Sequence, residues 1–99
     1  MRYTEFKRLK NLECKCDESY LELFKEKNTI KVKDKRNKTN EHGAYDVHVI
    51  GISEKQIYVA CPYCNDVHNH GRTESSDGSY GTREPHCRTK NKKAYFIYR

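Results

Sequence analysis

The chain has 99 residues, of which 34% are hydrophobic and 34% are charged, and its mean hydropathy is −1.13. A domain of this size buries only about two thirds of its unfolded surface, so its apolar core is expected to be thin and to need a bound metal. No stretch approaches the roughly 20 apolar residues that span a bilayer, which argues against a membrane partner. The formal net charge of +6 and the pI near 9.1 favour a polyanion instead.

Cysteine usage and the first residues predict a cytoplasmic protein. The opening sequence MRYTEFKRLKNLECKC is charged throughout and has no apolar run of the kind found in signal peptides. Thiols stay reduced in the cytoplasm, and the odd number of five cysteines argues against a closed set of disulfides.

The N-terminal part is expected to contain a short helix and a hairpin. Thr4 is a suitable helix cap. Apolar and polar residues alternate over residues 20–24 and again over 30–32, with Lys27-Asn28 as the turn between two strands. Residues 34–43 (DKRNKTNEHG) hold no large apolar side chain and are predicted to form a flexible loop. This loop suggests two parts, an N-terminal hairpin segment (1–40) and a zinc-ribbon-like domain (41–99).

The second part is predicted to be built from strands. Residues 45–52 (YDVHVIGI) and 56–60 (QIYVA) should pair as an antiparallel hairpin, and the second strand runs directly into the motif CPYC. Residues 66–70 suit a short strand, residues 71–81 a glycine-rich and serine-rich loop, and residues 94–98 (AYFIY) a closing strand packed on the hairpin. The predicted fold class is therefore mainly β, a set of small zinc-ribbon-like antiparallel hairpins with at most one short helix near the N-terminus.

The motif CPYC predicts a zinc site. Two thiolates separated by two residues at the end of a strand converge on one ion, at about 2.3 Å from each sulfur. Imidazole and thiolate groups downstream suit Zn²⁺ better than Ca²⁺ or Mg²⁺. His70 is preferred over His68 as the histidine ligand because its greater distance from the motif gives the chain room to turn back. The predicted ligands are Cys61, Cys64, His70 and Cys87, with His68 and His86 as alternates.

Three other chemistries fit these residues less well than a zinc site, and no catalytic residue is predicted. CPYC resembles a glutaredoxin motif, but residues 65–71 do not suit the helix that must follow, and the chain after them is too short for that fold. The zinc deaminases need His-x-Glu, which is absent. His68-Asn69-His70 spells the letters of the HNH nucleases, whose residues are not consecutive. Cys14 and Cys16 are read as thiols, with a second metal completed by His42 or His48 as the alternative.

Basic residues flank the last predicted strand, beside aromatic ones. This combination suits phosphate contacts and base stacking. Aromatic residues here also suit a core, and alternation allows both roles, with Tyr95 and Ile97 on one face of the strand and Phe96 and Tyr98 on the other. The predicted nucleic-acid-binding residues are Arg83, Arg88, Lys90, Lys92 and Lys93.

The segment CPYCNDVHNHG, followed by Gly81, Arg83 and His86-Cys87, resembles small zinc-ribbon-like proteins of phages and bacterial genomes. Their pattern is C-P-x-C-G-x-x-H-x-H-G, then a glycine-rich loop, an arginine and H-C, and it covers residues 57–98. Asn65 replaces the usual glycine. The resemblance implies zinc and a phage or mobile-element origin, and it implies no activity.

Taken together, the sequence predicts a structural-zinc module that docks on nucleic acid or on a nucleic-acid-binding host protein, as a phage-encoded modulator of host transcription or defence. The alternatives are a protein–protein inhibitor without nucleic-acid affinity and, more remotely, an HNH-like metal-dependent nuclease.

Overall fold

The computed structural model describes residues 14–27, 29–74, 76, 78–85, 87 and 94–98. Its elements are β1 (Cys14–Lys15), η1 (Glu18–Tyr20), β2 (Leu21–Glu26), β3 (Thr29–Asp34), β4 (Lys38–Thr39), β5 (Tyr45–Ile52), β6 (Gln56–Ala60), β7 (Val67–Gly71), β8 (Gly81–Arg83) and β9 (Tyr95–Tyr98). The predicted mainly β fold is confirmed. The one helical element in this part is the short 3-10 turn η1, and the helix expected after Thr4 lies outside the described residues. No helix in the described part is long and apolar enough to cross a membrane.

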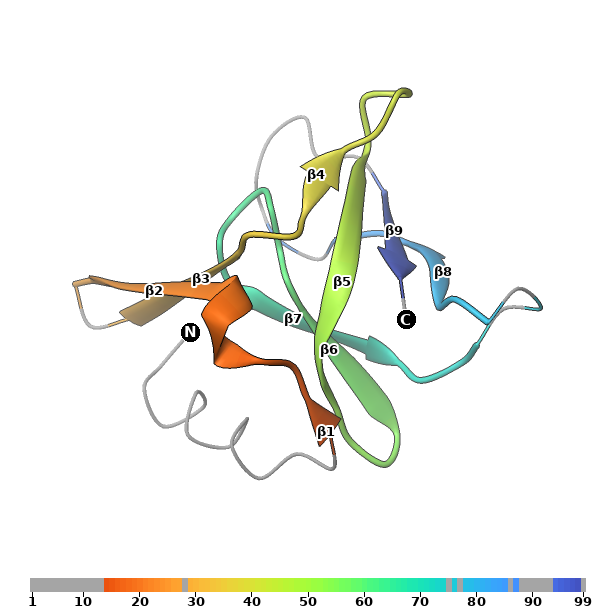
Figure 1. The fold of residues 1–99 in the computed structure, drawn as a ribbon, viewed down its shortest axis with the longest axis horizontal. Helices are drawn as coiled ribbons and strands as arrows, with labels where there is room; N and C mark the ends of the chain where they lie inside the picture. The colour runs from red at the N-terminus through yellow and green to blue at the C-terminus, as the bar shows by residue number, and fades with distance from the viewer. Residues whose placement is uncertain are drawn as a thin grey trace.

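Strand β5 is the centre of the larger sheet (Figure 1). Its first half pairs with β4 and, in parallel, with β9, whereas its second half pairs antiparallel with β6 and β1. A bulge between Val49 and Gly51 separates the two halves. Bulges increase the local twist of a strand, so β5 can change partners along its length.

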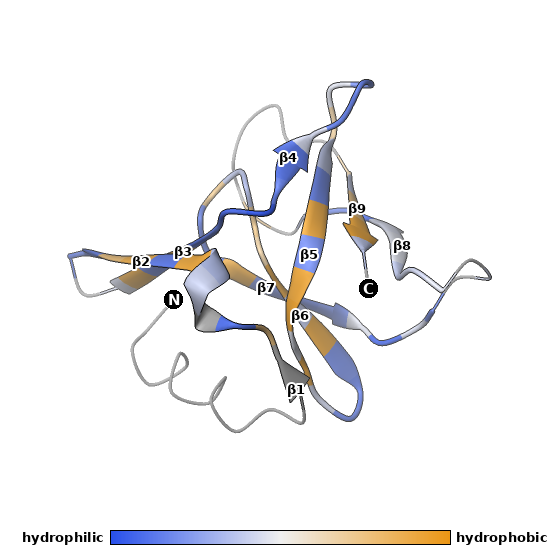
Figure 2. Ribbon diagram, in the orientation of Figure 1, coloured by the Kyte–Doolittle hydropathy of each residue, from blue (hydrophilic) through white to orange (hydrophobic). Residues whose placement is uncertain are grey.

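The predicted hairpin of residues 45–60 is confirmed by the pairing of β5 with β6, and β7 adds to its far edge. The closing strand is also confirmed, as β9, which lies between β5 and β8. Alternation along these strands sends one set of side chains into the main core, and Figure 2 shows the apolar positions along β5, β6 and β9. The core residues are Val47, Ile57, Val59, Cys61, Tyr80, Tyr95 and Ile97.

The predicted N-terminal hairpin is confirmed as the β2–β3 pair, in register from Leu21 opposite Asp34 to Glu26 opposite Thr29. It forms a separate two-stranded sheet. Ile30 and Val32 pack against Ala60 at the end of β6, in a second, smaller core. The backbone N–H of Val32 donates to the carbonyl oxygen of Asn65 at 2.8 Å, so β3 lies against the CPYC turn.

The polar segment after β3 differs from the loop that the sequence predicts. Asp34 ends β3 with a buried side chain, and its carboxylate accepts two hydrogen bonds from the guanidinium of Arg36, at 3.0 and 2.7 Å. The Asn37 side chain donates to the carbonyl oxygen of Ala60 and accepts from the N–H of His48. Polar side chains therefore hold this segment to β5 and β6, and β4 pairs with β5 although it has no apolar residue.

Candidate metal centre

The turn between β6 and β7 carries the CPYC motif. The N–H of Asn65 donates to the carbonyl oxygen of Cys61 at 2.9 Å, and the N–H of Cys61 donates to the carbonyl oxygen of Asp66 at 2.8 Å. Asn65 has a φ of 58°, a left-handed angle that asparagine adopts more readily than most residues. The turn is therefore tight. It returns β7 antiparallel to β6 with His68 opposite Val59.

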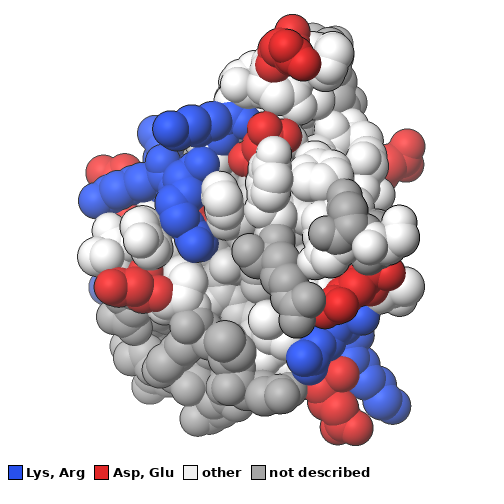
Figure 3. All heavy atoms as spheres, turned by 45° about the vertical axis from the view of Figure 1, so that its right-hand side comes forward, with Lys and Arg blue, Asp and Glu red and all other residues white. Residues whose placement is uncertain are grey.

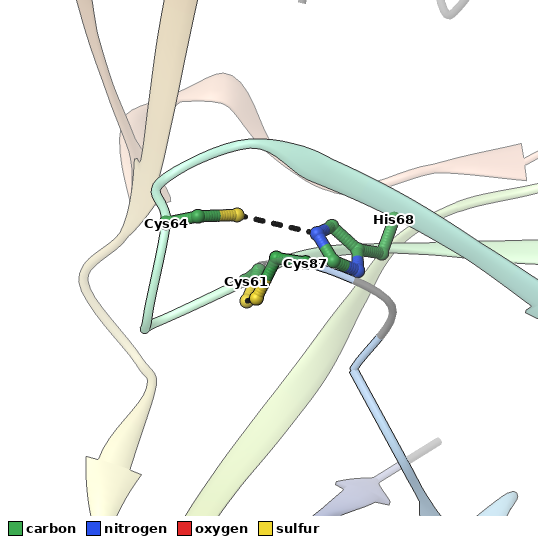
Figure 4. Close-up of side chains that lie close together, drawn as sticks. All are labelled: Cys61, Cys64, His68 and Cys87. Atoms are coloured by element: carbon green, nitrogen blue, oxygen red, sulfur yellow. Dashed lines mark hydrogen bonds between the residues drawn. The ribbon is translucent and has the colours of Figure 1, made fainter. Parts of the chain in front are cut away.

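Four potential ligands converge beside this turn (Figure 4). The sulfurs of Cys61 and Cys87 are 3.9 Å apart, and the sulfur of Cys64 lies 3.2 Å from Nε2 of His68. The four ligand atoms all lie within 4.8 Å of one another. Cys61 is buried and the other three residues are half-buried, so the group is a possible metal-binding site of three cysteines and one histidine.

Burial disfavours the charged form of these thiols. It raises the pKa of Cys61 to about 12, and it also raises the pKa of Cys64. A redox-active cysteine needs the opposite shift, which a helix N-terminus supplies in CxxC oxidoreductases. Here the strand β7 follows the motif. The glutaredoxin interpretation therefore has no support in the fold.

His70, the preferred histidine ligand in the sequence analysis, is placed away from this group. Its Nε2 lies 2.6 Å from the hydroxyl oxygen of Tyr95, and the two rings meet edge to face at 5.6 Å. Both side chains are buried, so this hydrogen bond joins β7 to β9 inside the protein. The structure thus brings together the three predicted cysteines and the alternate His68. The other alternate, His86, lies outside the described residues.

The remaining cysteines and histidines do not form a second group within the described residues. Cys16 is a half-buried free thiol whose N–H donates to the carbonyl oxygen of Ile50. His42 is exposed and lies 3.3 Å from the carboxylate of Glu41. His48 stacks on the ring of Tyr98.

Arg83 supports the loop between β7 and β8. Its Nε donates to the carbonyl oxygen of Tyr80, and its Nη2 donates to those of Gly71 and Thr73, at 3.1 to 3.3 Å. The guanidinium is therefore used to hold the loop. The other predicted nucleic-acid contacts lie outside the described residues: Arg88, Lys90, Lys92 and Lys93.

Comparison of the chain with protein-family models, with curated proteins and with solved structures gives no match.

Proposed function

We propose that Cys61, Cys64, His68 and Cys87 coordinate one Zn²⁺ ion and that this ion is structural. The observation that carries the proposal is the approach of all four ligand atoms to within 4.8 Å. Zinc–sulfur bonds of 2.3 Å at tetrahedral angles separate two sulfurs by about 3.8 Å. The Cys61–Cys87 sulfur distance of 3.9 Å fits that value. Three thiolates and an imidazole are also the donor types that zinc prefers.

A set of four protein ligands favours a structural role over a catalytic one. Catalytic zinc usually keeps one position open for water, whereas structural zinc is closed by the protein. Two ligands lie in the β6–β7 turn, one in β7 and one in the segment before β9. The ion would therefore cross-link parts of the chain that are distant in sequence and would support the thin core.

Metal content and folding test this proposal directly. Native mass spectrometry of the purified chain should show one zinc ion, and a strong chelator should unfold the region around the metal. His68→Ala should release zinc, whereas His70→Ala should retain one ion, and Cys16→Ser is the control for loss of a thiol elsewhere. A folded, zinc-free protein that resists the chelator would contradict the proposal.

We further propose that the module docks on nucleic acid or on a protein machine that acts on nucleic acid. The net charge of +6 supports this. On the face drawn in Figure 3, Lys and Arg side chains gather in two places, each with Asp or Glu side chains beside it. The resemblance described above would give the protein a phage or mobile-element origin, and our proposal adds that it modulates host transcription or defence.

A protein–protein inhibitor without nucleic-acid affinity is the alternative. The two proposals separate in a pull-down from host lysate with and without nuclease treatment. Recovery of nucleic acid with the bait, lost after nuclease, supports nucleic-acid docking. A protein partner that remains bound after nuclease, with no nucleic acid recovered, supports the inhibitor.

The remaining alternative, an HNH-like nuclease, finds no support in the geometry. His68 lies against the sulfur of Cys64, and His70 is hydrogen bonded to Tyr95. The Asn69 amide donates to the side-chain oxygen of Gln56. The three consecutive side chains thus serve three different structural contacts.

A further inference from the structure

The outward face of the sheet around β9 carries a row of rings. Residues opposite one another in a sheet share a face. One such row crosses β4, β5, β9 and β8 and consists of Lys38, Asp46, Phe96 and Thr82. A second row crosses β5 and β9 and consists of His48 and Tyr98. The opposite face holds fully buried side chains, namely Val47, Tyr95 and Ile97. The two rows therefore lie on the side that faces solvent.

Three rings on this face are in mutual contact. His48 and Tyr98 stack with ring centres 5.4 Å apart and planes 22° apart, and Phe96 meets Tyr98 edge to face at 4.9 Å. The Tyr98 side chain is 42% exposed. Contiguous apolar groups on the exposed face of a small protein often mark an interaction site, so these three rings are a candidate binding site.

Positive charge lies at the β4 edge of the same face. Lys38 is exposed there, and together with Lys33 it also lines a pocket of about 440 Å³ whose other walls include Tyr45 and Pro62. Asn37 also lines this pocket, and its side-chain oxygen accepts a hydrogen bond from the backbone N–H of His48 at 3.0 Å. The pocket itself lies beside Tyr45 and the CPYC turn, so Lys38 is the lining residue that also shares the face of the rings.

The acidic groups nearby have partners of their own. The Asp34 carboxylate in the pocket is bound by both nitrogens of the Arg36 fork, which offsets its charge. Asp46, in the row with Phe96, accepts a hydrogen bond from the Asn40 amide at 3.2 Å. Among the described residues, neither Lys33 nor Lys38 lies within ion-pair distance of a carboxylate.

We propose that this outward face is a binding surface for single-stranded nucleic acid. Bases stack on Tyr98 and Phe96, and a backbone phosphate lies at Lys38. A single strand is the occupant because only unpaired bases expose a ring face for stacking, while Lys38 complements its charge. The inference rests on the proposed docking on nucleic acid and gives it a location.

Fluorescence anisotropy with the full zinc-loaded chain tests the surface. The probes are labelled single strands of about 12 nucleotides, within the range that small β domains cover, and a duplex of equal length. Tyr98→Ala and Phe96→Ala should each weaken single-strand binding by roughly 5- to 150-fold, whereas Tyr98→Phe should retain it. Lys38→Gln should reduce the log–log salt slope by about 0.7.

Matched controls come from the β2–β3 hairpin. Phe24 is 40% exposed, close to the value for Tyr98, so Phe24→Ala removes an equally exposed ring elsewhere. Lys25→Gln removes an exposed charge on the same hairpin. Both should bind as the unmodified chain does, and zinc content should confirm that every variant is folded.

The outcomes separate the two proposals. If single strands bind but Tyr98→Ala and Phe96→Ala bind as tightly as Phe24→Ala, the surface is wrong and nucleic-acid docking stands. Equal or tighter binding of the duplex also overturns the single-strand surface. If no strand binds even at low salt, direct nucleic-acid binding fails and the surface fails with it.

Discussion

The hydrogen bond between His70 and Tyr95 is the most buried polar contact between β7 and β9. The Tyr95 side chain is fully buried and His70 is 7% exposed, so water cannot replace either partner. Removing one member of such a pair leaves the other with an unmet hydrogen-bonding group, which costs about 1 to 3 kcal/mol.

Tyr95→Phe should therefore lower the free energy of unfolding by about 1 to 3 kcal/mol while retaining zinc. Urea denaturation with excess zinc measures the change. Tyr58→Phe, at a half-buried position in β6, is the matched control. Equal stability of the two variants would show that the buried hydroxyl contributes nothing.

His48 should titrate below its ordinary pKa of 6.5, mainly because burial disfavours the imidazolium. The positive charges of Arg36 and Lys38 lower this pKa further, whereas the carboxylates of Asp34 and Asp46 raise it. The imidazole of His48 binds a proton less readily in the folded state than in the unfolded state, so acid favours unfolding. The stability that depends on neutral His48 is therefore complete above about pH 6.5 and is lost as the pH falls through the lower, folded-state pKa.

A proton NMR titration of the zinc-loaded chain should place the His48 midpoint below 6.5. In thermal melts between pH 7.5 and 5.5, His48→Gln should lose less stability on acidification than the unmodified chain. The exposed His42→Gln variant should behave like the unmodified chain. A His48 midpoint at or above 6.5 would contradict the argument.

For individual residues, the sequence predicted the types of metal ligand but not which histidine is the ligand. His68 and His70 alternate along one strand, and the preference for His70 assumed that the chain needs length to turn back. The backbone hydrogen bonds of Asn65 and Cys61 make the turn tight, so the nearer histidine reaches the sulfurs. Arg83 was similarly predicted from its charge, whereas its role depends on carbonyl groups of a loop that residue types do not reveal.

Among the elements, the β6–β7 turn depends most on one backbone angle. Asn65 has a φ of 58°, where a branched side chain is strained by roughly 1 to 2 kcal/mol. The same residue joins the turn to β3, because its carbonyl oxygen accepts from the N–H of Val32.

Asn65→Gly should keep the zinc affinity, whereas Asn65→Val should weaken zinc binding by roughly 5- to 30-fold, the equivalent of that strain. Competition with a chromophoric chelator measures the affinity. Asn69→Val makes the same exchange at an exposed position of strand β7 and should have little effect. If valine is tolerated equally at both positions, the left-handed angle is not what limits the turn.

The strands were predictable because alternation of apolar and polar residues is a local property, as the β2–β3 and β5–β6 pairs show. The segment 34–40 was not, because it has no apolar pattern and is ordered by Asp34 with Arg36 and by Asn37. The strand β9 was predicted, but its parallel partner was not, since the register with β5 is set by contacts distant in sequence.

For the molecule as a whole, the candidate metal site connects the β6–β7 hairpin to the segment before β9. Removal of zinc with a chelator should therefore increase hydrogen exchange in β8, β9 and the CPYC turn more than in the β2–β3 hairpin. Hydrogen-exchange mass spectrometry measures this, and added zinc should restore protection. Exchange in β8 and β9 that is indifferent to the chelator would show that the ion does not hold the C-terminal strands.

The position of β9 between β5 and β8 also has a consequence for the order of folding. Asp46 pairs with Phe96, so this parallel contact closes a long stretch of chain, and such contacts form slowly. A zinc ion that joins Cys61 to Cys87, 26 residues apart, would shorten the chain loop that closes when β9 pairs with β5. In the described sheet β8 pairs with β9 alone, so β8 has no strand to pair with until β9 has paired with β5. We therefore expect the hairpins β2–β3 and β5–β6–β7 to fold first and zinc to bind next. The refolding rate of β8 and β9 should then rise with zinc concentration.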